Sequence, residues 1–410
     1  MLSPRRKPHP ESLLIGGLLT ALIALGQLAT AIYAPSMPSL AGVFGTTAET
    51  VALTLTVFLA GFAVSQLVFG PLSDRFGRRP VLLWGVVLFL IGSLGCALSN
   101  GIGALIAWRF VQSVGACSGA VLGRAIVRDI YGRERAAKAL AYIGIAFSVS
   151  PAVSPIIGGY LQVWYGWRSP FLFLTGIGLI LLALGWTLLS ESNKTPDPNA
   201  LAPGAMLRNF RVLLTDRTFL GYMAALSLTF SGLMAFVASA PFLIIEQLHL
   251  SPDHFGLLAA LTSAGTLAGN LSAGTLTTRL GTRRMVAGGC AISLAGALIM
   301  AGFGLAGHFG IWLVMGPMIV FLWGMGTVMP NAMAGAIGPF ARMTGAASAL
   351  LGFFQMAAGA AAGMIAGGLP HDTQWPLGMM MVLLAGSSLL LFAVLVRRRA
   401  EPSEAVSGNP

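Results

Sequence analysis

The segment GPLSDRFGRRP (residues 70–80) places one aspartate and three arginines between two long apolar stretches. The stretch before it reads VALTLTVFLAGFAVSQLVF, and the stretch after it reads VLLWGVVLFLIGSLGCAL. Each is close to the length of about 20 apolar residues that a helix needs to cross a bilayer. The charged segment is therefore predicted to be a short turn between two membrane-spanning helices.

The composition of the whole chain agrees with a lipid environment. Of its 410 residues, 56% are hydrophobic and 9% are charged, whereas a soluble domain carries about 25% charged residues. Apolar runs recur without the alternation of barrel strands, and helices satisfy their own backbone hydrogen bonds in lipid. We predict an all-α polytopic membrane protein with twelve transmembrane helices. The predicted spans are residues 13–33, 51–72, 80–98, 102–123, 139–161, 170–189, 219–245, 255–276, 285–306, 311–333, 345–368 and 377–396.

The distribution of basic residues predicts the orientation of the chain. With the N-terminus in the cytoplasm and every run crossing, 22 of the 24 lysines and arginines fall in inner segments. The exceptions are Arg109, within a run, and Arg168, in an outer loop. This asymmetry follows the positive-inside rule. The net charge of +11 is thus interpreted as a topology signal and not as a nucleic-acid surface, and both termini are predicted to be cytoplasmic.

Two other features are interpreted as structural. The first run follows three basic residues but is longer than the core of a signal peptide, so we interpret it as an uncleaved helix. The three cysteines, Cys96, Cys117 and Cys290, fall far apart within predicted spans. They are expected to be buried packing residues, with no disulfide, metal site or cofactor.

An internal repeat divides the chain into two halves. The segment GTLTTRLGTRR (residues 274–284) matches residues 70–80 at five of eleven positions, with a constant offset of 204. The longest hydrophilic segment, residues 191–218, lies between the sixth and seventh runs. Two parallel halves with a central site form a secondary-transporter architecture. The predicted units are a cytoplasmic tail (1–12), a six-helix half (13–190), a cytoplasmic linker (191–218), a second six-helix half (219–396) and a cytoplasmic tail (397–410).

The twelve runs, the repeat and the motif G-x-L-x-D-R-x-G-R-R together resemble the major facilitator superfamily. Four further stretches resemble its drug:proton antiporter branch, and in particular the bicyclomycin-resistance and chloramphenicol-exporter subgroup. They are WRFVQSVGA (108–116), SPAVSPIIGGY (150–160), APFLIIEQLHLSPDHFG (240–256) and PNAMAGAIGPFARMTGAASALLG (330–352). The resemblance implies a monomeric secondary transporter in a bacterial inner membrane. It would export small apolar or amphiphilic compounds by alternating access in exchange for protons.

No enzyme site is recognised in the sequence, and no phosphate-binding loop accompanies the spans. We therefore expect a gradient-driven transporter and neither an enzyme nor an ATP-driven pump. Two alternatives stay open on the same fold. One is an uptake symporter or metabolite carrier, and the other is a membrane sensor that does not transport.

Two segments are expected to control conformational change. In residues 70–80, Asp74 is the only acid, and the resemblance implies that it latches the two halves on the cytoplasmic side, with Arg124 as a candidate partner. The alternative is a solvated basic turn that only sets topology. In the fifth run, prolines and glycines would kink the helix and permit close packing, a pattern that marks exporters in the family. The expected gating residues are Gly70, Asp74, Arg75, Gly77, Arg78, Arg79, Arg124, Pro151, Pro155, Gly158 and Gly159.

Arg109 is the one charge deep within a predicted span. A charge at the centre of a membrane helix costs about 2.5–3.5 kcal/mol on insertion scales, so a functional reason is expected. Arg109 is predicted to face the cavity between the halves, with Gln112 one turn further on the same helix face. The alternative is that its long side chain snorkels to the outer interface.

The remaining candidate ligands are polar side chains within spans. Each is either a ligand or a helix–helix hydrogen bond. These candidates are Gln27, Tyr33, Gln66, Tyr142, Tyr222, Asn331 and Gln355.

The acids bear on substrate charge. Ala31 stands where many relatives in the subgroup carry an aspartate, and no acid is expected at mid-membrane. Neutral or anionic substrates are therefore predicted over permanent cations. Glu246 is the first choice for proton coupling, and the alternative is an interfacial charge without a role.

Overall fold

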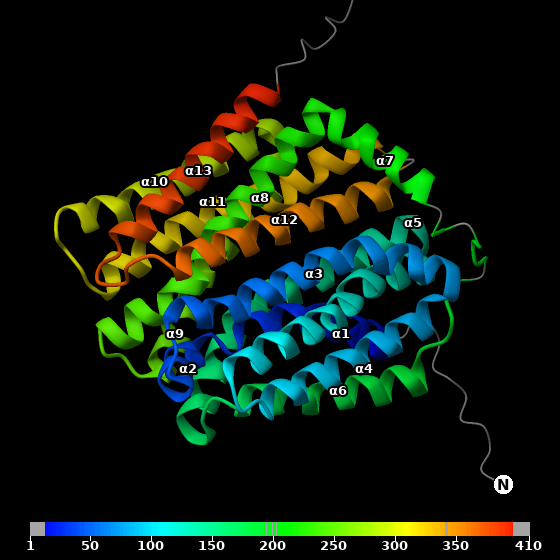
Figure 1. The fold of residues 1–410 in the computed structure, drawn as a ribbon. Coiled ribbons are helices and arrows are strands. Elements are labelled where there is room, and N and C mark those ends of the chain that lie inside the picture. Colours follow the sequence, from blue (N-terminus) through cyan, green and yellow to red (C-terminus); the bar gives the residue numbers. More distant parts are fainter. Residues whose placement is uncertain (1–12, 194, 199, 202, 341–342, 397–410) are drawn as a thin grey trace, which may run out of the picture.

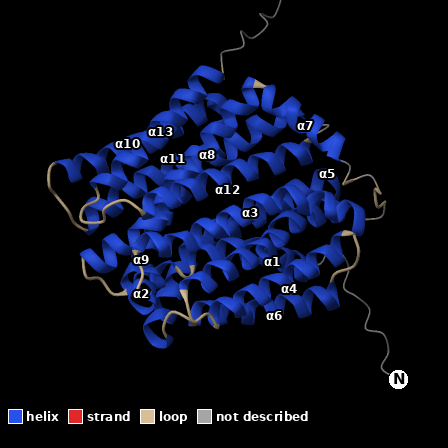
Figure 2. Cartoon of the chain, viewed as in Figure 1, coloured by secondary structure: helices blue, strands red, loops and turns tan. Residues whose placement is uncertain are grey.

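The computed structural model describes residues 13–396 except residues 194, 199, 202 and 341–342, and it describes only the backbone of residues 13, 132–149, 151, 203 and 205. The described residues form helices joined by short loops and contain no strand (Figure 2). The first helices are α1 (Leu13–Ala31), η1 (Ala34–Ser36), α2 (Met37–Phe44), α3 (Ala48–Phe76), α4 (Arg78–Ala97), α5 (Ile102–Tyr165) and α6 (Ser169–Leu188). The others are α7 (Pro203–Thr215), α8 (Arg217–Pro241), η2 (Phe242–Gln247), α9 (Pro252–Leu280), α10 (Thr282–Leu305), α11 (Ile311–Ile337), η3 (Gly338–Phe340), α12 (Thr344–Gly367) and α13 (Trp375–Leu395).

The predicted all-α membrane architecture is confirmed. Ten stretches of the described residues are long and apolar enough to cross a membrane. Two of the twelve predicted spans are not among them. Residues 139–161 lie in the part of α5 that is largely described by its backbone alone, and residues 255–276 lie in α9, where Thr, Ser and Asn side chains lower the hydropathy. The count of twelve therefore stays a prediction for these two.

Helix α5 turns back on itself. Arg109 near its start bonds to the carbonyl of Ala29 in the last turn of α1, and Gly158 near its end lies against the carbonyl of Ile32, the residue that follows α1. A straight helix rises 1.5 Å per residue, so these two positions would lie roughly 70 Å apart on a straight axis. The axis must therefore reverse between them. This agrees with the two separate spans predicted at 102–123 and 139–161.

The internal repeat has a close structural counterpart. Helices α3 and α9 both contain 29 residues, and each ends at a glycine with positive φ, Gly77 at 95° and Gly281 at 79°. An L-amino acid with a side chain rarely adopts this conformation. The glycine pair of the repeat thus provides the same break before α4 and α10. The boundaries of the two halves and of the linker stay a prediction, and the linker contains the helix α7.

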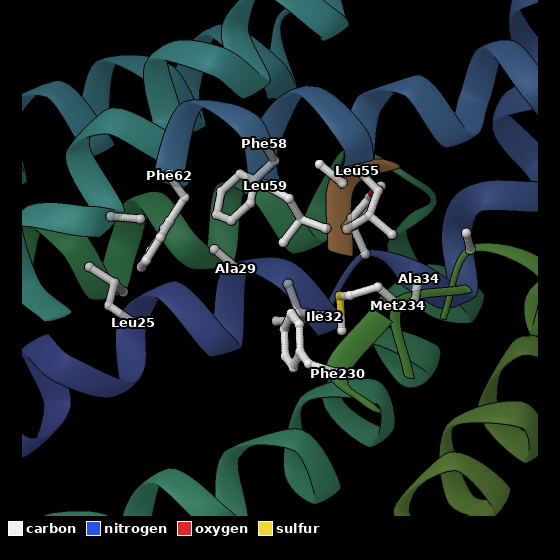
Figure 3. Close-up of a cluster of buried hydrophobic side chains, with 14 of the residues drawn as sticks. Leu25, Ala29, Ile32, Ala34, Leu55, Phe58, Leu59, Phe62, Phe230 and Met234 are labelled. Carbon is white, nitrogen blue, oxygen red and sulfur yellow. The ribbon is translucent and has the colours of Figure 1, made fainter. Parts of the chain in front are cut away.

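The two sets of helices lie side by side. In Figure 1 the blue and cyan helices occupy the lower part of the view, and most of the yellow, orange and red helices occupy the upper part. Their apolar interiors meet: side chains of α1 and α3 lie opposite Phe230 and Met234 of α8 (Figure 3). Residues from both halves therefore belong to one buried cluster.

Glycines permit the closest approaches between the two sets. A β-carbon on Gly256 of α9 would collide with the backbone carbonyl of Pro155 in α5. A β-carbon on Gly352 of α12 would collide with the Gln66 amide of α3. Small residues let membrane helices pack backbone to backbone in this way. The α5–α9 and α3–α12 contacts are thus the seams between the halves.

Candidate functional site

Arg109 is enclosed within the N-terminal helices. Its side chain is fully buried. The guanidinium donates from Nη1 to the backbone carbonyl of Ala29 in α1, at 3.1 Å, and to Oε1 of Gln112, at 2.6 Å. Nε donates to the carbonyl of Thr54 in α3, at 3.4 Å. The group therefore ties α1 and α3 to α5.

Aromatic rings surround the remaining faces of the guanidinium. Its Cζ lies 4.2 Å from the ring centroids of both Tyr33 and Phe58, and 6.0 Å from that of Phe171. A desolvated cation over an aromatic face gains about 2 kcal/mol or more. No described Asp or Glu forms an ion pair with Arg109. Carbonyl dipoles and ring faces thus stabilise the positive charge in place of a counter-ion.

The position of Ala29 in its helix explains why its carbonyl accepts the hydrogen bond from Arg109. It lies in the last turn of α1, where backbone carbonyls have no partner within the helix. A cation at this end also interacts favourably with the helix dipole. Gln112 extends the network, because its Nε2 donates to the hydroxyl of Ser93 in α4, at 2.9 Å. One guanidinium thereby joins four elements of the N-terminal half.

Neither sequence-based expectation about the orientation of Arg109 is met in this structure. The side chain does not face an open cavity, since it is fully buried among N-terminal helices. It does not snorkel to the interface either, since its polar atoms bond to the protein interior. Nη2 is buried and makes no hydrogen bond with a described residue. Sequence reasoning missed Phe58 and Phe171, which carry no local signal because their part in the enclosure depends on how α3 and α6 pack.

The other candidate ligands do not gather at one place. Tyr33 is buried, and its hydroxyl lies 3.1 Å from the Thr54 hydroxyl, so it belongs to the Arg109 enclosure. Asn331 accepts from the Thr277 hydroxyl at 2.9 Å, which joins α11 to α9. Tyr222 packs edge-on against Phe392. Asn331 and Tyr222 thus make helix–helix contacts.

Four candidates remain open. Gln66 is buried against Gly352 at the α3–α12 seam. Gln27 and Gln355 are partly exposed. The Tyr142 side chain lies outside the described residues.

A second cluster of charges lies where α3 ends and α4 begins. Asp74 forms an ion pair with Arg78 at 2.6 Å, and Nε of Arg78 reaches Asp129 of α5 at 3.2 Å. The structure thus pairs Asp74 with Arg78 and not with Arg124, whose Nε donates to the carbonyl of Ala120 in its own helix. The two ion pairs of this cluster join helices of the N-terminal half, and none of its hydrogen bonds or ion pairs with described residues reaches the C-terminal half.

The start of the linker is bound to this cluster. The Glu191 carboxylate accepts from the backbone N–H groups of Arg78 at 2.9 Å and Arg79 at 3.1 Å. It therefore caps the N-terminus of α4, whose first N–H groups have no partner within the helix. Asn193 donates to the carbonyl of Asp74 at 2.9 Å. Sequence reasoning missed Glu191, because its partners lie 112 and 113 positions away.

The other arginines of the motif stack on aromatic rings. Arg79 donates to the carbonyl of Trp186 at 2.7 Å and lies over its ring, and Arg75 lies over Phe76. Gly70 is open on its Cβ side, whereas a β-carbon on Gly77 would lie 2.7 Å from the Glu191 carboxylate. Gly77 thus leaves room for the cap, in addition to its positive φ.

Pro155 and Gly159, in the second arm of α5, form the seam with α9. A β-carbon on Gly159 would meet the carbonyl of Pro252 in α9, whereas one on Gly158 would meet the carbonyl of Ile32, the residue that follows α1. The carbonyl of Pro155 faces Gly256. The Pro151 side chain lies outside the described residues.

Glu246 lies on an unusual helical turn. The segment η2 is a π-helix that follows Pro241 at the end of α8. Such turns are rare and often occur at functional sites. The Glu246 side chain is exposed and forms no ion pair with a described residue. Its geometry therefore permits proton exchange with solvent but does not by itself require it.

Comparison with known proteins gives consistent matches over nearly the whole chain. The family model of the Major Facilitator Superfamily matches residues 19–251 and 223–410. A bicyclomycin resistance protein homolog of Haemophilus influenzae is 29% identical, over 93% of this chain and 95% of the relative. Multidrug resistance protein D of Escherichia coli is 30% identical, over 95% of this chain and 97% of the relative. A chloramphenicol resistance protein of Pseudomonas aeruginosa is 30% identical, over 90% and 87%.

Solved structures resemble the fold at much lower identity. The crystal structure of a D-xylose-proton symporter superposes with a TM-score of 0.74 at 16% identity, over 93% of this chain and 98% of that chain. The partially occluded inward-open xylose transporter XylE of E. coli gives 0.71 at 17% identity, over 91% and 95%. At this identity the likeness concerns the fold alone.

Proposed function

The chain belongs to the Major Facilitator Superfamily, and from this premise we propose that it is a secondary active transporter that exports small apolar or amphiphilic compounds, antibiotics included. It works by alternating access in a bacterial inner membrane, with both termini in the cytoplasm. Protons are the coupling ion, and the functional unit is a monomer in lipid. The names of the relatives, which refer to resistance to bicyclomycin, chloramphenicol and several drugs, support this choice of substrates.

The observation that carries the proposal is the seam between α5 and α9. The stretch that resembles the exporter motif provides the residues of α5 at this seam, with Pro155 and Gly159 against Gly256 and Pro252. Alternating access requires the two halves to move against each other around a central site. Backbone contacts at glycines fix how closely the halves approach in one of the two states. We place this seam at the outer ends of the helices, where it closes the outer side.

The buried charge supports a preference among substrates. Of the described residues, Arg109 is the only charged side chain that is buried, and no buried carboxylate accompanies it. A permanent cation entering between the halves would meet like charge in a medium of low dielectric, where the repulsion is strong. The transporter therefore prefers neutral or anionic compounds. Export of ethidium or tetraphenylphosphonium at rates equal to neutral antibiotics would show this preference to be wrong.

The test of export uses a host that lacks its own efflux pumps. Expression should raise the resistance to some neutral antibiotics, and an uncoupler of the proton gradient should abolish the gain. Gly256→Ala should remove most of the gain, because its new β-carbon meets the Pro155 carbonyl, whereas Gly288→Ala should keep it, because nothing lies within 4 Å of a β-carbon there. Resistance that is unchanged across the panel, or increased drug accumulation, would count against an exporter.

The coupling group is tested separately. Glu246→Gln should leave the protein in the membrane but make the remaining export insensitive to the uncoupler. Export by this variant that stays sensitive to the uncoupler would leave Glu246 as an interfacial charge.

A further inference from the structure

The linker helix α7 has two faces with different surroundings. Leu213 is fully buried, and Phe210 packs with it against a core cluster that includes Phe219 and Tyr222 of α8. Beside this buried part, Leu207 is 70% exposed and Leu214 is 38% exposed. Residues 207, 211 and 214 follow one stripe of a helix, because positions three and four apart share a face. The apolar arc of α7 therefore extends beyond the part that the protein covers.

The uncovered edge of α7 is lined by arginine. Arg211 lies on the stripe between Leu207 and Leu214, and Arg208 lies one position beyond Leu207; both are exposed. The helix contains no acidic residue. The neighbouring Asp216 accepts from the backbone N–H of Phe219 at 2.7 Å and so caps α8. No ion pair joins Arg208 or Arg211 to another described residue.

The position of α7 places this edge at the membrane boundary. The apolar stretch that begins with α8 starts at Arg217, two residues after the end of α7. In Figure 1, α7 lies at the right-hand end of the helices, beside the end of α12, and crosses that end. A helix there meets the headgroup region on one side and the protein on the other.

We propose that α7 binds anionic phospholipid of the cytoplasmic leaflet. Leu207 and Leu214 insert between the lipids, and Arg208 and Arg211 bind the phosphates of the headgroups. An exposed leucine edge beside arginines is the pattern of helices that lie in the interface plane, and each basic residue there is attracted by anionic lipid. The proposal goes beyond export and depends only on the cytoplasmic placement of residues 191–218.

The binding has a structural consequence. Because the buried face of α7 packs on the core around Phe219 and Tyr222, a lipid held on the outer edge fixes the linker against the start of α8. The linker is in turn bound to the N-terminal half through Glu191 and Asn193. Anionic lipid would thus restrain the segment that joins the two halves.

The first experiment measures the depth of the exposed edge. The three native cysteines are buried, so single substitutions Leu207→Cys, Leu214→Cys and Thr195→Cys can carry a spin label on the full-length protein. The vesicles contain phosphatidylcholine alone or with one quarter phosphatidylglycerol. Labels at 207 and 214 should be more accessible to oxygen than to a water-soluble nickel chelate, and the label at 195 should show the reverse. Labels at 207 and 214 that are open to the nickel chelate in both lipids would overturn the proposal.

The second experiment measures the preference for anionic lipid. A fluorophore at Leu207→Cys should be quenched at least about twofold more by spin-labelled phosphatidylglycerol than by spin-labelled phosphatidylcholine. The double substitution Arg208→Gln with Arg211→Gln should abolish this difference in quenching between the two lipids. The matched double substitution Arg279→Gln with Arg284→Gln removes the same charge from the end of α9 and the start of α10, and the difference in quenching should remain. Equal quenching by both lipids in the parent protein, or shielding of position 207 in detergent by a co-purifying protein, would refute lipid as the occupant.

Discussion

The two halves repeat one backbone but differ in their use of charge. Helices α3 and α9 have equal length and end at glycines with positive φ. In the N-terminal half this break carries Asp74 and Arg78, which form an ion pair; the repeat has Thr278 and Thr282 at the matching positions. The break itself therefore needs glycine and no carboxylate.

The interiors of the halves differ in the same way. The N-terminal half buries the Arg109 guanidinium among carbonyls and rings. The described hydrogen bonds between buried side chains of the C-terminal half are neutral, as between the Thr229 and Ser388 hydroxyls at 3.1 Å, and the charged Arg283, which donates to the Val396 carbonyl at 3.0 Å, lies at the start of α10. The two copies of the shared frame thus differ in their buried charge. We infer that the N-terminal half carries the steps of transport that depend on a buried charge, whereas the exposed Glu246 of the C-terminal half is the candidate for proton coupling.

The largest effect is expected at Arg109. Lysine keeps the charge but loses the planar fork and the stacking. A hydrogen bond to a charged group contributes about 1.5–3 kcal/mol, and about 3 kcal/mol corresponds to about a 100-fold effect. Arg109→Lys should therefore lower the rate of drug export by about 100-fold, measured in vesicles with equal amounts of protein.

A second arginine provides the matched control. Arg168 also stacks on an aromatic ring, Trp167, and donates to the backbone carbonyls of Ala97 and Ser99, but it lies in the loop between α5 and α6 and is exposed. Arg168→Lys should change export by less than about threefold on the scale used for Arg109. Equal effects of the two substitutions would show that enclosure within the membrane gives Arg109 no special role.

The second-largest effect on export is expected at Asp74, which has no acidic counterpart in the repeated segment. The Asp74 side chain is 45% exposed, and such ion pairs contribute about 0–1 kcal/mol to stability. Asp74→Asn should therefore leave folding nearly unchanged. It should lower export by about tenfold, because Asp129 is then the only charged partner that Arg78 keeps among the described residues. Transport rates and melting temperatures of the same preparations separate these two effects.

The reverse substitution in the second half sharpens this test. Thr278→Asp places a carboxylate at the repeated position, but Thr282 and not arginine lies four residues further. It should change export less than twofold. If Asp74→Asn exports like the parent protein, residues 70–80 act only as a topology signal.

The sequence allowed the repeated frame to be predicted because that frame depends on local chemistry. Apolar length, the Gly77 and Gly281 breaks and the constant offset are all properties of short segments. The first span of α5 was predicted for the same reason, and the second stays a prediction. The partner of Asp74 was also within reach, since Arg78 lies four positions on, but the break at Gly77 separates the two residues into different helices.

The surroundings of Arg109 could not be predicted in the same way. Its partners are backbone carbonyls and ring faces on α1, α3 and α6, and a carbonyl leaves no mark in the sequence. A charge within an apolar span predicted that Arg109 has a role, but it did not predict the direction of the Arg109 side chain. Glu191 was missed because it caps α4 from beyond the sixth span.

A smaller effect is expected for the cap of α4, which has no counterpart before α10. Glu191→Ala leaves two backbone N–H groups without their acceptor, and loss of a helix cap costs about 1 kcal/mol. The melting temperature in detergent should fall by a few degrees at most. Glu49→Ala removes an exposed acid from the first turn of α3 and is the control. An equal fall for both would mean that loss of an acid near a helix start, and not the cap, explains the change.

The smallest effect tests whether the C-terminal half responds to protons. Burial lowers the pKa of the His371 imidazole, although the Asp372 carboxylate opposes this, and the ring packs on Phe242 of η2. Because the unfolded chain then binds the proton more readily, stability is complete above the ordinary pKa of about 6.5 and declines as the pH falls below it. The melting temperature should fall slightly between pH 7 and pH 5, less so in His371→Gln than in the parent protein. His254→Gln, at an exposed histidine, should leave the dependence unchanged. If His371→Gln keeps the full dependence, the acid response belongs to other groups, the charges of the N-terminal half being the first to examine.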